Sequence, residues 1–399
     1  MKKVNKVGLV ALGLLSLALA GGAQALPVKI VSVSPLSGDL APIGTEVKRG
    51  AELAVQDQLR SFKALGIDLQ LDAIDDQATA KNGTVIATAL ASSDGVLGVI
   101  GALNSGVTKT LAQGLAGSNL PIITPASTND GLTGNGWKNF YRMVTTDSAQ
   151  GVAAAGYLAE TLRPKKVFVI SDNTAYGNGL TRAFQNALKS RKIPVAGYVG
   201  ASSDAQIASV VAKAKASGAD LIYYGGTDDV APTLLKALRA AGVTANFMGG
   251  DGLDSPSFLK RTGIDAVGVL YSTGFGPVNV FNGAQAFTEK YEAAYKTRPS
   301  GVAIYAYDAT TVLLEAVRNA MKALGGNMIP TRQQINEQLR KTNMPACASS
   351  TARCNLISGA VAFDPSGERM LSRVFVMKLN NVLQAQVATV QTVKASDLK

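Results

Sequence analysis

The sequence predicts an α/β fold with two doubly wound lobes, each built on a parallel sheet and joined by a multi-strand hinge. Short apolar runs rich in β-branched residues alternate with longer stretches of helical period. This alternation pauses near residues 145–147 and then begins again in the same order. Two more long helical patterns follow residue 277, after a stretch rich in Gly and Pro. The 399-residue chain is also too long for one ordinary core.

The first unit lies before residue 145 and alternates strands with helices. Strands are expected at 28–34, 68–75, 96–101 and 121–124, and helices at 43–65, 78–91 and 105–117. Strands that alternate with helices of this length favour a parallel sheet covered on both faces.

The second unit repeats this architecture without repeating the sequence. Helices are expected at 148–162, 176–191, 205–217 and 230–241, and strands at 166–171, 193–199, 220–224 and 247–249. Two similar units in tandem indicate two lobes.

The last part of the chain is expected to return to the first lobe. Residues 272–277 are typical of a connection, helices are expected at 282–296 and 302–324, and a final pair of strands at 360–364 and 373–379 flanks a turn. Several crossings between lobes would form a hinge that bends around a cleft. The expected division is 26–146 plus 274–357 for lobe 1, and 147–273 plus 358–399 for lobe 2.

Residues 1–25 have the pattern of a secretory signal peptide. Three lysines precede an apolar run at 7–20, and Ala23-Gln24-Ala25 has the small residues of a cleavage site. The alternative is a membrane anchor, but the run is short for a bilayer span. We expect export, with cleavage after Ala25.

The composition excludes several classes of protein. The net charge of +11 is spread along the chain without a dense basic stripe, so nucleic acid is not an expected partner. The chain has no His, which excludes Ser-His-Asp and Cys-His catalysis and His-ligated zinc. Cys347 and Cys354 are the two cysteines, and a disulfide between them suits an exported chain. We expect no metal and no cofactor.

Small polar residues follow several of the expected strands, where open α/β sheets bind ligands. Ser105 begins an expected helix and Thr128 lies in the loop after 121–124, while Tyr176 and Asp251 follow strands of the second unit. Taken singly, each could be only a cap, a turn residue or a packed aromatic. Together, hydroxyls and amides on one lobe and a carboxylate on the other are complementary to a zwitterion.

Seven segments carry a resemblance to a known family. They are Pro35-Leu36-Ser37-Gly38, residues 101–105, Pro125-Ala126-Ser127-Thr128-Asn129, Tyr176-Gly177-x-Gly179, Tyr223-Tyr224-Gly225-Gly226, Phe247-Met248-Gly249 and Ala306-Tyr307-Asp308-Ala309. In this order and spacing, the chain resembles the periplasmic substrate-binding proteins of branched-chain amino-acid ABC transporters. The resemblance covers nearly the whole mature chain and implies the type I periplasmic-binding-protein fold.

The resemblance also implies roles for particular residues. Ser105, the Ala126 backbone and Thr128 would receive the head group of an amino acid, and Asp251 and Tyr176 would close on it from the second lobe. It implies a monomeric, non-enzymatic, extracytoplasmic component of an importer, located in the periplasm, that delivers its ligand to a membrane permease.

Two positions depart from the leucine-binding members of that family. Thr227 and Ile43 stand where those members carry Tyr and Trp, which indicates a different side-chain pocket. The expected ligand is therefore a branched-chain or other apolar amino acid. An amide, urea or aromatic acid on the same fold remains an alternative, as do an enzyme on a doubly wound fold and a pure interaction module.

Overall fold

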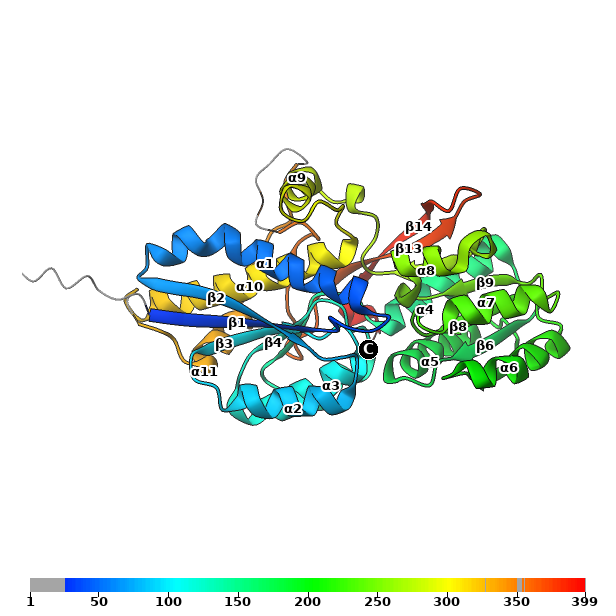
Figure 1. Ribbon diagram of the computed structural model, residues 1–399, viewed down its shortest axis with the longest axis horizontal. Helices are drawn as coiled ribbons and strands as arrows, with labels where there is room; N and C mark the ends of the chain where they lie inside the picture. The colour runs from blue at the N-terminus through cyan, green and yellow to red at the C-terminus, as the bar shows by residue number, and fades with distance from the viewer. Residues whose placement is uncertain (1–25, 327, 350–353, 355, 399) are drawn as a thin grey trace, which may run out of the picture.

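Two lobes lie side by side in the computed structural model, which describes residues 26–398 apart from 327, 350–353 and 355 (Figure 1). The expected signal peptide, 1–25, lies outside the described residues. Among those that are described, no helix has both the length and the apolar character that a membrane span needs.

The first lobe is built on a five-stranded parallel sheet. Its strands are β1 (Leu26–Ser34), β2 (Ile67–Asp75), β3 (Val96–Gly101), β4 (Ile122–Thr124) and β5 (Phe140–Arg142). Their order is β2-β1-β3-β4-β5, and every pairing is parallel. The sequence prediction missed only β5, which has three residues and no alternating pattern.

Helices cover both faces of this sheet. They are α1 (Ala41–Lys63), α2 (Ala80–Ala91), α3 (Ser105–Leu115), α9 (Ala284–Tyr295), α10 (Gly301–Ala323) and α11 (Arg332–Leu339). Figure 1 shows α1 and α10 on one side of the sheet and α2 and α3 on the other. The late helices thus return to the first lobe, as expected.

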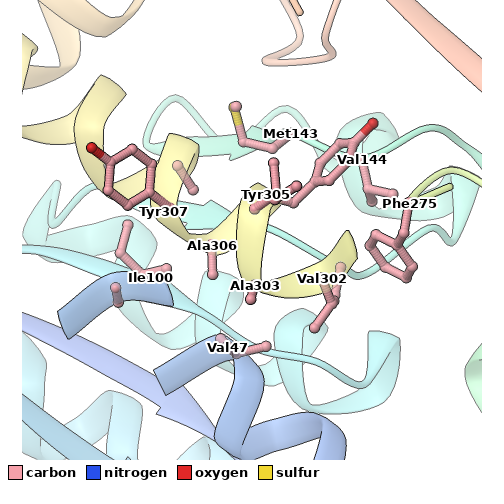
Figure 2. Packing of buried hydrophobic residues seen from close by; sticks show 14 of the residues in the cluster. Val47, Ile100, Met143, Val144, Phe275, Val302, Ala303, Tyr305, Ala306 and Tyr307 are labelled. Carbon is pink, nitrogen blue, oxygen red and sulfur yellow. The ribbon is translucent and has the colours of Figure 1, made fainter. Parts of the chain in front are cut away.

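Helix α10 forms the centre of the lobe's core. Nearly its whole length is buried, because it lies between α1, the sheet and the connection that contains Phe275. Figure 2 shows Ala303 and Ala306 of α10 close to Val47 of α1, while Tyr305 points towards Met143 and Val144. Gly50 of α1 permits this close approach to α10, since a Cβ at that position would lie 2.2 Å from the Ala303 carbonyl oxygen.

The second lobe repeats the strand order of the first and adds two antiparallel strands. Its strands are β6 (Val167–Ser171), β7 (Val195–Gly200), β8 (Leu221–Gly225), β9 (Asn246–Gly249), β10 (Leu270–Thr273), β13 (Leu371–Leu379) and β14 (Ala385–Lys394). The parallel part has the order β7-β6-β8-β9-β10. Strand β13 then joins β10 in antiparallel fashion, so this sheet is mixed rather than wholly parallel.

The helices of the second lobe match the predicted pattern with one addition. They are α4 (Asp147–Tyr157), α5 (Ala175–Ser190), α6 (Asp204–Ser217), α7 (Ala231–Ala240) and α8 (Pro256–Thr262). Across both lobes, short helical turns lie at Ala116–Ser118, Asp130–Asn135, Leu158–Leu162, Asp251–Leu253, Gly263–Ala266, Val278–Val280 and Ala395–Leu398. Helix α8 was missed because it has only seven residues.

The predicted pairing of the last strands is wrong. Strand β12 (Val361–Ala362) pairs with β11 (Asn343–Met344), whereas β13 pairs with β10 and β14. Ser272 and Thr273, expected in a connection, belong to β10. The partners β11 and β10 lie far from β12 and β13 along the chain, and no local turn signal shows them.

Three crossings join the lobes, which confirms the predicted multi-strand hinge. They lie between β5 and α4, after β10, and before β13. The third crossing falls near residue 370, later than the expected residue 358, because Glu368 bridges Arg142 at the edge of the first sheet. The fully buried Arg142 donates through Nε to Glu368 Oε1 at 2.9 Å.

The predicted disulfide is confirmed. Cys347 and Cys354 are bonded, with their Cα atoms 5.3 Å apart. Asn282 Nδ2 donates to the Cys347 carbonyl at 3.1 Å, so the bridge lies beside the connection to α9.

Candidate functional site

A cavity of about 320 Å³ lies between the lobes at the carboxyl ends of their strands. The first lobe contributes loop and helix residues after β1, β2, β3 and β4, and the second lobe contributes residues after β6, β8 and β9. The lining residues are Leu40, Ile43, Ala78, Ala80, Leu103, Asn104, Ser105, Gly106, Val107, Ala126, Thr174, Ala175, Tyr176, Thr227, Asp228, Asp251, Gly252 and Phe275.

Six of the seven predicted site residues line this cavity. They are Ile43, Ser105, Ala126, Tyr176, Thr227 and Asp251. Thr128 is not on the wall. It is buried behind it, and its carbonyl accepts a hydrogen bond from the Asp147 amide at 2.8 Å.

The N-terminus of α3 gives the first lobe a site for an anion. Ser105 is the first residue of the helix, and the preceding Asn104 makes no side-chain cap. The buried Ser105 hydroxyl has no hydrogen-bond partner within the described chain. First-turn amides of a helix lack intrahelical acceptors and attract negative charge. This end of the cavity therefore suits a carboxylate.

Internal hydrogen bonds fix the two loops that carry these groups. Thr108 Oγ1 lies 2.6 Å from Ser127 Oγ, which also donates to the Ala102 and Leu103 carbonyls. The Arg142 guanidinium donates to the Ser127 carbonyl at 3.3 Å. The loop after β3 and the loop after β4 are thus held against each other.

Asp251 gives the second lobe a carboxylate that faces the cavity. Its Oδ1 accepts hydrogen bonds from Tyr176 OH at 2.6 Å and from Gln150 Nε2 at 3.1 Å. No donor to Oδ2 occurs in the described part of the chain. Burial raises the pKa of Asp251 to about 6, although the bonds from Tyr176 and Gln150 act against this rise.

Tyr176 holds Asp251 in place rather than presenting a free hydroxyl. Its OH donates to Asp251 and accepts from the Gly252 amide at 2.9 Å. Gln150 supports the same carboxylate from α4, and its Oε1 accepts from Ser272 Oγ at 3.1 Å. These hydrogen bonds therefore fix the orientation of the second carboxylate oxygen of Asp251, Oδ2, at the cavity.

Further acceptors lie across from Asp251. The Thr128 hydroxyl is buried beside the Asp147 carboxylate and favours its charged form, and no described residue donates to the Ala126 carbonyl. Asp147 is itself fully buried. Burial, with Asp130 and Asp251 nearby, raises the pKa of Asp147 well above its ordinary value.

The lobes touch each other around the cavity. Asn129 Nδ2 of the first lobe donates to the Ala175 carbonyl of the second at 2.7 Å. At the mouth, Arg261 Nη1 lies 3.3 Å from Asp39 Oδ2. The two lobes are thus in direct contact beside the cavity.

Sequence reasoning missed several residues of the site. Asp228 and Asn104 lie in loops that follow strands. The expectation that ligands bind beyond the carboxyl ends of the strands, which identified Asp251, therefore applies to them too. Phe275 and Gln150 carried no local signal, because their places in the site depend on the hinge and on the packing of α4.

The charged side chains on the cavity wall are all acidic. No Lys or Arg is among its lining residues, and two carboxylates, Asp228 and Asp251, are. Within the described ranges, no cluster of three or more His, Cys, Asp or Glu could hold a metal ion.

A family model described as "Periplasmic binding protein" matches residues 27–384. The chain belongs to this family. This chain is 32% identical over 259 residues to the Leu/Ile/Val-binding protein of Escherichia coli (strain K12), across 65% of this chain and 70% of that protein. It is 31% identical over 325 residues to an amino acid binding protein of Pseudomonas aeruginosa, across 80% and 86% of the two chains.

Solved structures show the same fold. A leucine binding protein from Thermotoga maritima has a TM-score of 0.81 and 26% identity, across 93% of this periplasmic binding protein and 99% of that chain. A solute binding protein from R. palustris, in complex with benzoate, has a TM-score of 0.78 and 21% identity, across 92% and 98% of the two chains. The second likeness concerns the fold alone.

Proposed function

We propose that this chain is the extracytoplasmic solute-binding component of an ABC importer, which binds a branched-chain or other apolar amino acid between its lobes. The observation that carries the proposal is one closed cavity with an anion site at α3, a carboxylate at Asp251 and apolar walls. An amino acid has matching groups: a carboxylate, an ammonium and an apolar side chain.

The ligand carboxylate binds Ser105 Oγ and the first-turn amides of α3. Its ammonium binds Asp251 Oδ2 and the Ala126 carbonyl, and Thr128 lies buried behind this part of the wall. Charged hydrogen bonds of this kind are short and strong, particularly where water is excluded.

The side chain lies against apolar groups from both lobes and the hinge. Leu40, Ile43, Leu103, Val107 and Phe275 form this wall. Ile43 and Thr227 give the pocket its own shape.

Closure completes the site. The open form presents the first-lobe groups, and the second lobe then brings Asp251, held by Tyr176 and Gln150, against the ammonium. A ligand that bridges both lobes stabilises the closed form because it binds that form better than the open one. The closed form delivers the ligand to a membrane permease.

We place the mature protein in the periplasm as a monomer, after cleavage following Ala25. We propose lobe boundaries of 26–146 plus 274–370, and 147–273 plus 371–399, which follow the three crossings. We assign no catalytic role to the cleft, whose polar groups are arranged to hold a charged head group.

The relatives support this ligand class. They include proteins named as binding Leu, Ile and Val, and one of them is named as binding Thr as well. A carboxylate at Asp251 would repel a simple aromatic acid, whereas it attracts the ammonium of an amino acid.

Calorimetric titration with leucine, isoleucine, valine, benzoate and urea tests the proposal. The expected result is binding of at least one amino acid with a Kd of about 1 μM or tighter, near −8 kcal/mol. Binding of benzoate or urea, with no heat from any amino acid, would overturn it.

A further inference from the structure

Asp228 is a second carboxylate on the cavity wall, and the head-group site does not use it. The residue is 2% exposed, and Ser255 Oγ donates to its Oδ2 at 2.6 Å. The Ser257 side chain is a second donor to this carboxylate. Burial raises the pKa of Asp228, but the Ser255 and Ser257 hydroxyls and Arg261 favour its charged form.

Asp228 lies at the mouth of the cavity. Arg261 Nη1 donates to the Asp228 carbonyl at 2.9 Å and lies 3.3 Å from Asp39 Oδ2 of the opposite lobe. Asp39 directly precedes Leu40, which lines the cavity. One guanidinium therefore places Asp228 beside the Leu40 end of the wall.

Asp251 lies on the neighbouring loop of the same lobe, against the hinge. Gln150 of α4 donates to it, and the same Gln150 accepts from Ser272 of β10, next to a crossing between lobes. A ligand whose ammonium binds Asp251 and whose side chain extends towards the mouth of the cavity therefore reaches Asp228.

The surroundings of Asp228 leave its charge open to the ligand. The wall around it is apolar, including Leu40 and Ile43, and no basic side chain lines the cavity. A carboxylate on an apolar wall is costly to desolvate, and a donor supplied by the ligand offsets that cost.

We propose that the ligand is an α-amino acid with an apolar stem and a hydrogen-bond donor at its far end, which binds Asp228. The donor is a hydroxyl, an amide or an amine. The inference rests on the proposed function, since the head-group site decides which end of the ligand reaches Asp228.

Matched pairs of amino acids test this inference by calorimetry. Lysine is norleucine with a terminal amine, and tyrosine is phenylalanine with a terminal hydroxyl. In the unaltered protein, at least one donor-bearing member should bind about 10- to 100-fold tighter than its apolar counterpart, the range for a charged hydrogen bond.

Two variants assign the preference to one carboxylate. Asp228→Asn should reduce it to less than about threefold, because the charged acceptor is lost. Asp229→Asn should retain it, because Asp229 does not line the cavity and accepts from Thr227 Oγ1 and the Val230 amide instead.

The outcomes separate the two proposals. If norleucine and phenylalanine bind at least as tightly as lysine and tyrosine, or if Asp228→Asn keeps the preference, the role of Asp228 is wrong while amino-acid binding stands. If no amino acid binds, the proposed function itself is wrong. The comparison in the unaltered protein does not depend on the folding of either variant.

Discussion

In the proposed binding mode, recognition of the ligand depends most on Asp251. Tyr176 and Gln150 satisfy one of its oxygens and leave the other directed at the cavity. Asp251, Tyr176 and Gln150 are all buried, so their hydrogen bonds hold the carboxylate in a fixed orientation. A carboxylate fixed before binding loses little entropy when the ammonium arrives.

Removal of this charge should weaken binding strongly. Asp251→Ala should reduce ligand affinity by about 2–5 kcal/mol, the cost of stripping one partner from a buried charged pair. Calorimetry measures the loss, and Asp94→Asn, an exposed carboxylate away from the cavity, is the control. A loss of less than about tenfold, or 1.4 kcal/mol, would place the ammonium elsewhere.

Affinity should depend on pH through the same residue. Burial raises the pKa of Asp251 to about 6 in the ligand-free protein, and a bound ammonium would lower it. The contribution of Asp251 to affinity is therefore full above about pH 6 and is lost as the pH falls through that value. The decline should approach about tenfold per pH unit and should disappear in Asp251→Asn, as titrations in a pH series would show. Constant affinity down to pH 5 would contradict this assignment.

Among the individual site residues, those that directly follow strands could be predicted from the sequence. Ser105, Ala126 and Asp251 line the cavity because the carboxyl ends of parallel strands meet there. Gln150 could not be predicted, since it lies within a helix whose packing against Ser272 depends on the hinge. The roles of the predicted residues in binding stay predictions until a ligand is tested.

Helices α3 and α5 begin on opposite sides of the cleft. A Cβ on Gly106 of α3 would lie 3.9 Å from Ala175 Cβ of α5. Asn129 connects the same region, since its Nδ2 donates to the Ala175 carbonyl at 2.7 Å. Closure thus brings the start of α5 onto the first lobe.

Loss of this contact should favour the open form. Asn129→Ala should weaken ligand binding by about 0.5–1.5 kcal/mol, mainly through faster dissociation, because the hydrogen bond to Ala175 joins the lobes. Stopped-flow measurement of dissociation would show the change. Asn135→Ala is the matched control, since Asn135 bonds only within its own turn, to Gly131 and Leu132. Equal dissociation rates in the two variants would contradict a role of Asn129 in closure.

Periodicity predicted most elements, and it failed where pairing is non-local. The alternation of apolar runs with helical patterns gave every strand of the parallel core except β5 and β10. Strand β14 was missed because most of its side chains are exposed, so it lacks a buried face. Strand β12 pairs with a segment that no turn connects to it.

A buried ion pair lies in the first lobe next to two of the crossings between lobes. Arg142 ends the last strand of the first sheet, and Glu368 lies on the segment that leads to β13. Arg142 also donates to the Asn129 carbonyl at 2.7 Å. The pair therefore links the hinge to the ligand-binding loop.

Breaking this pair should destabilise the protein. Glu368→Gln should lower the free energy of unfolding by about 3–5 kcal/mol, since it leaves the Arg142 guanidinium buried without its counter-charge. Urea unfolding measures the change. Asp72→Asn, in the exposed pair with Lys29, is the control and should cost less than about 1 kcal/mol. Similar losses in the two variants would show that the hinge pair is not structurally important.

The two-lobed architecture was predicted from the restart of the pattern after residue 147 and from the return of the late helices. The closed cavity could not be predicted in the same way, because its size and walls depend on how the lobes meet. Asp228 illustrates the difference, since its place at the mouth follows from Arg261 and Asp39 on opposite lobes.

A crystal structure with a bound amino acid tests the central claim most directly. The predicted result is an α-ammonium within about 3.2 Å of Asp251 Oδ2 and the Ala126 carbonyl oxygen, with the carboxylate on Ser105 Oγ. A ligand bound outside this cavity, or one whose carboxylate faces Asp251, would contradict it.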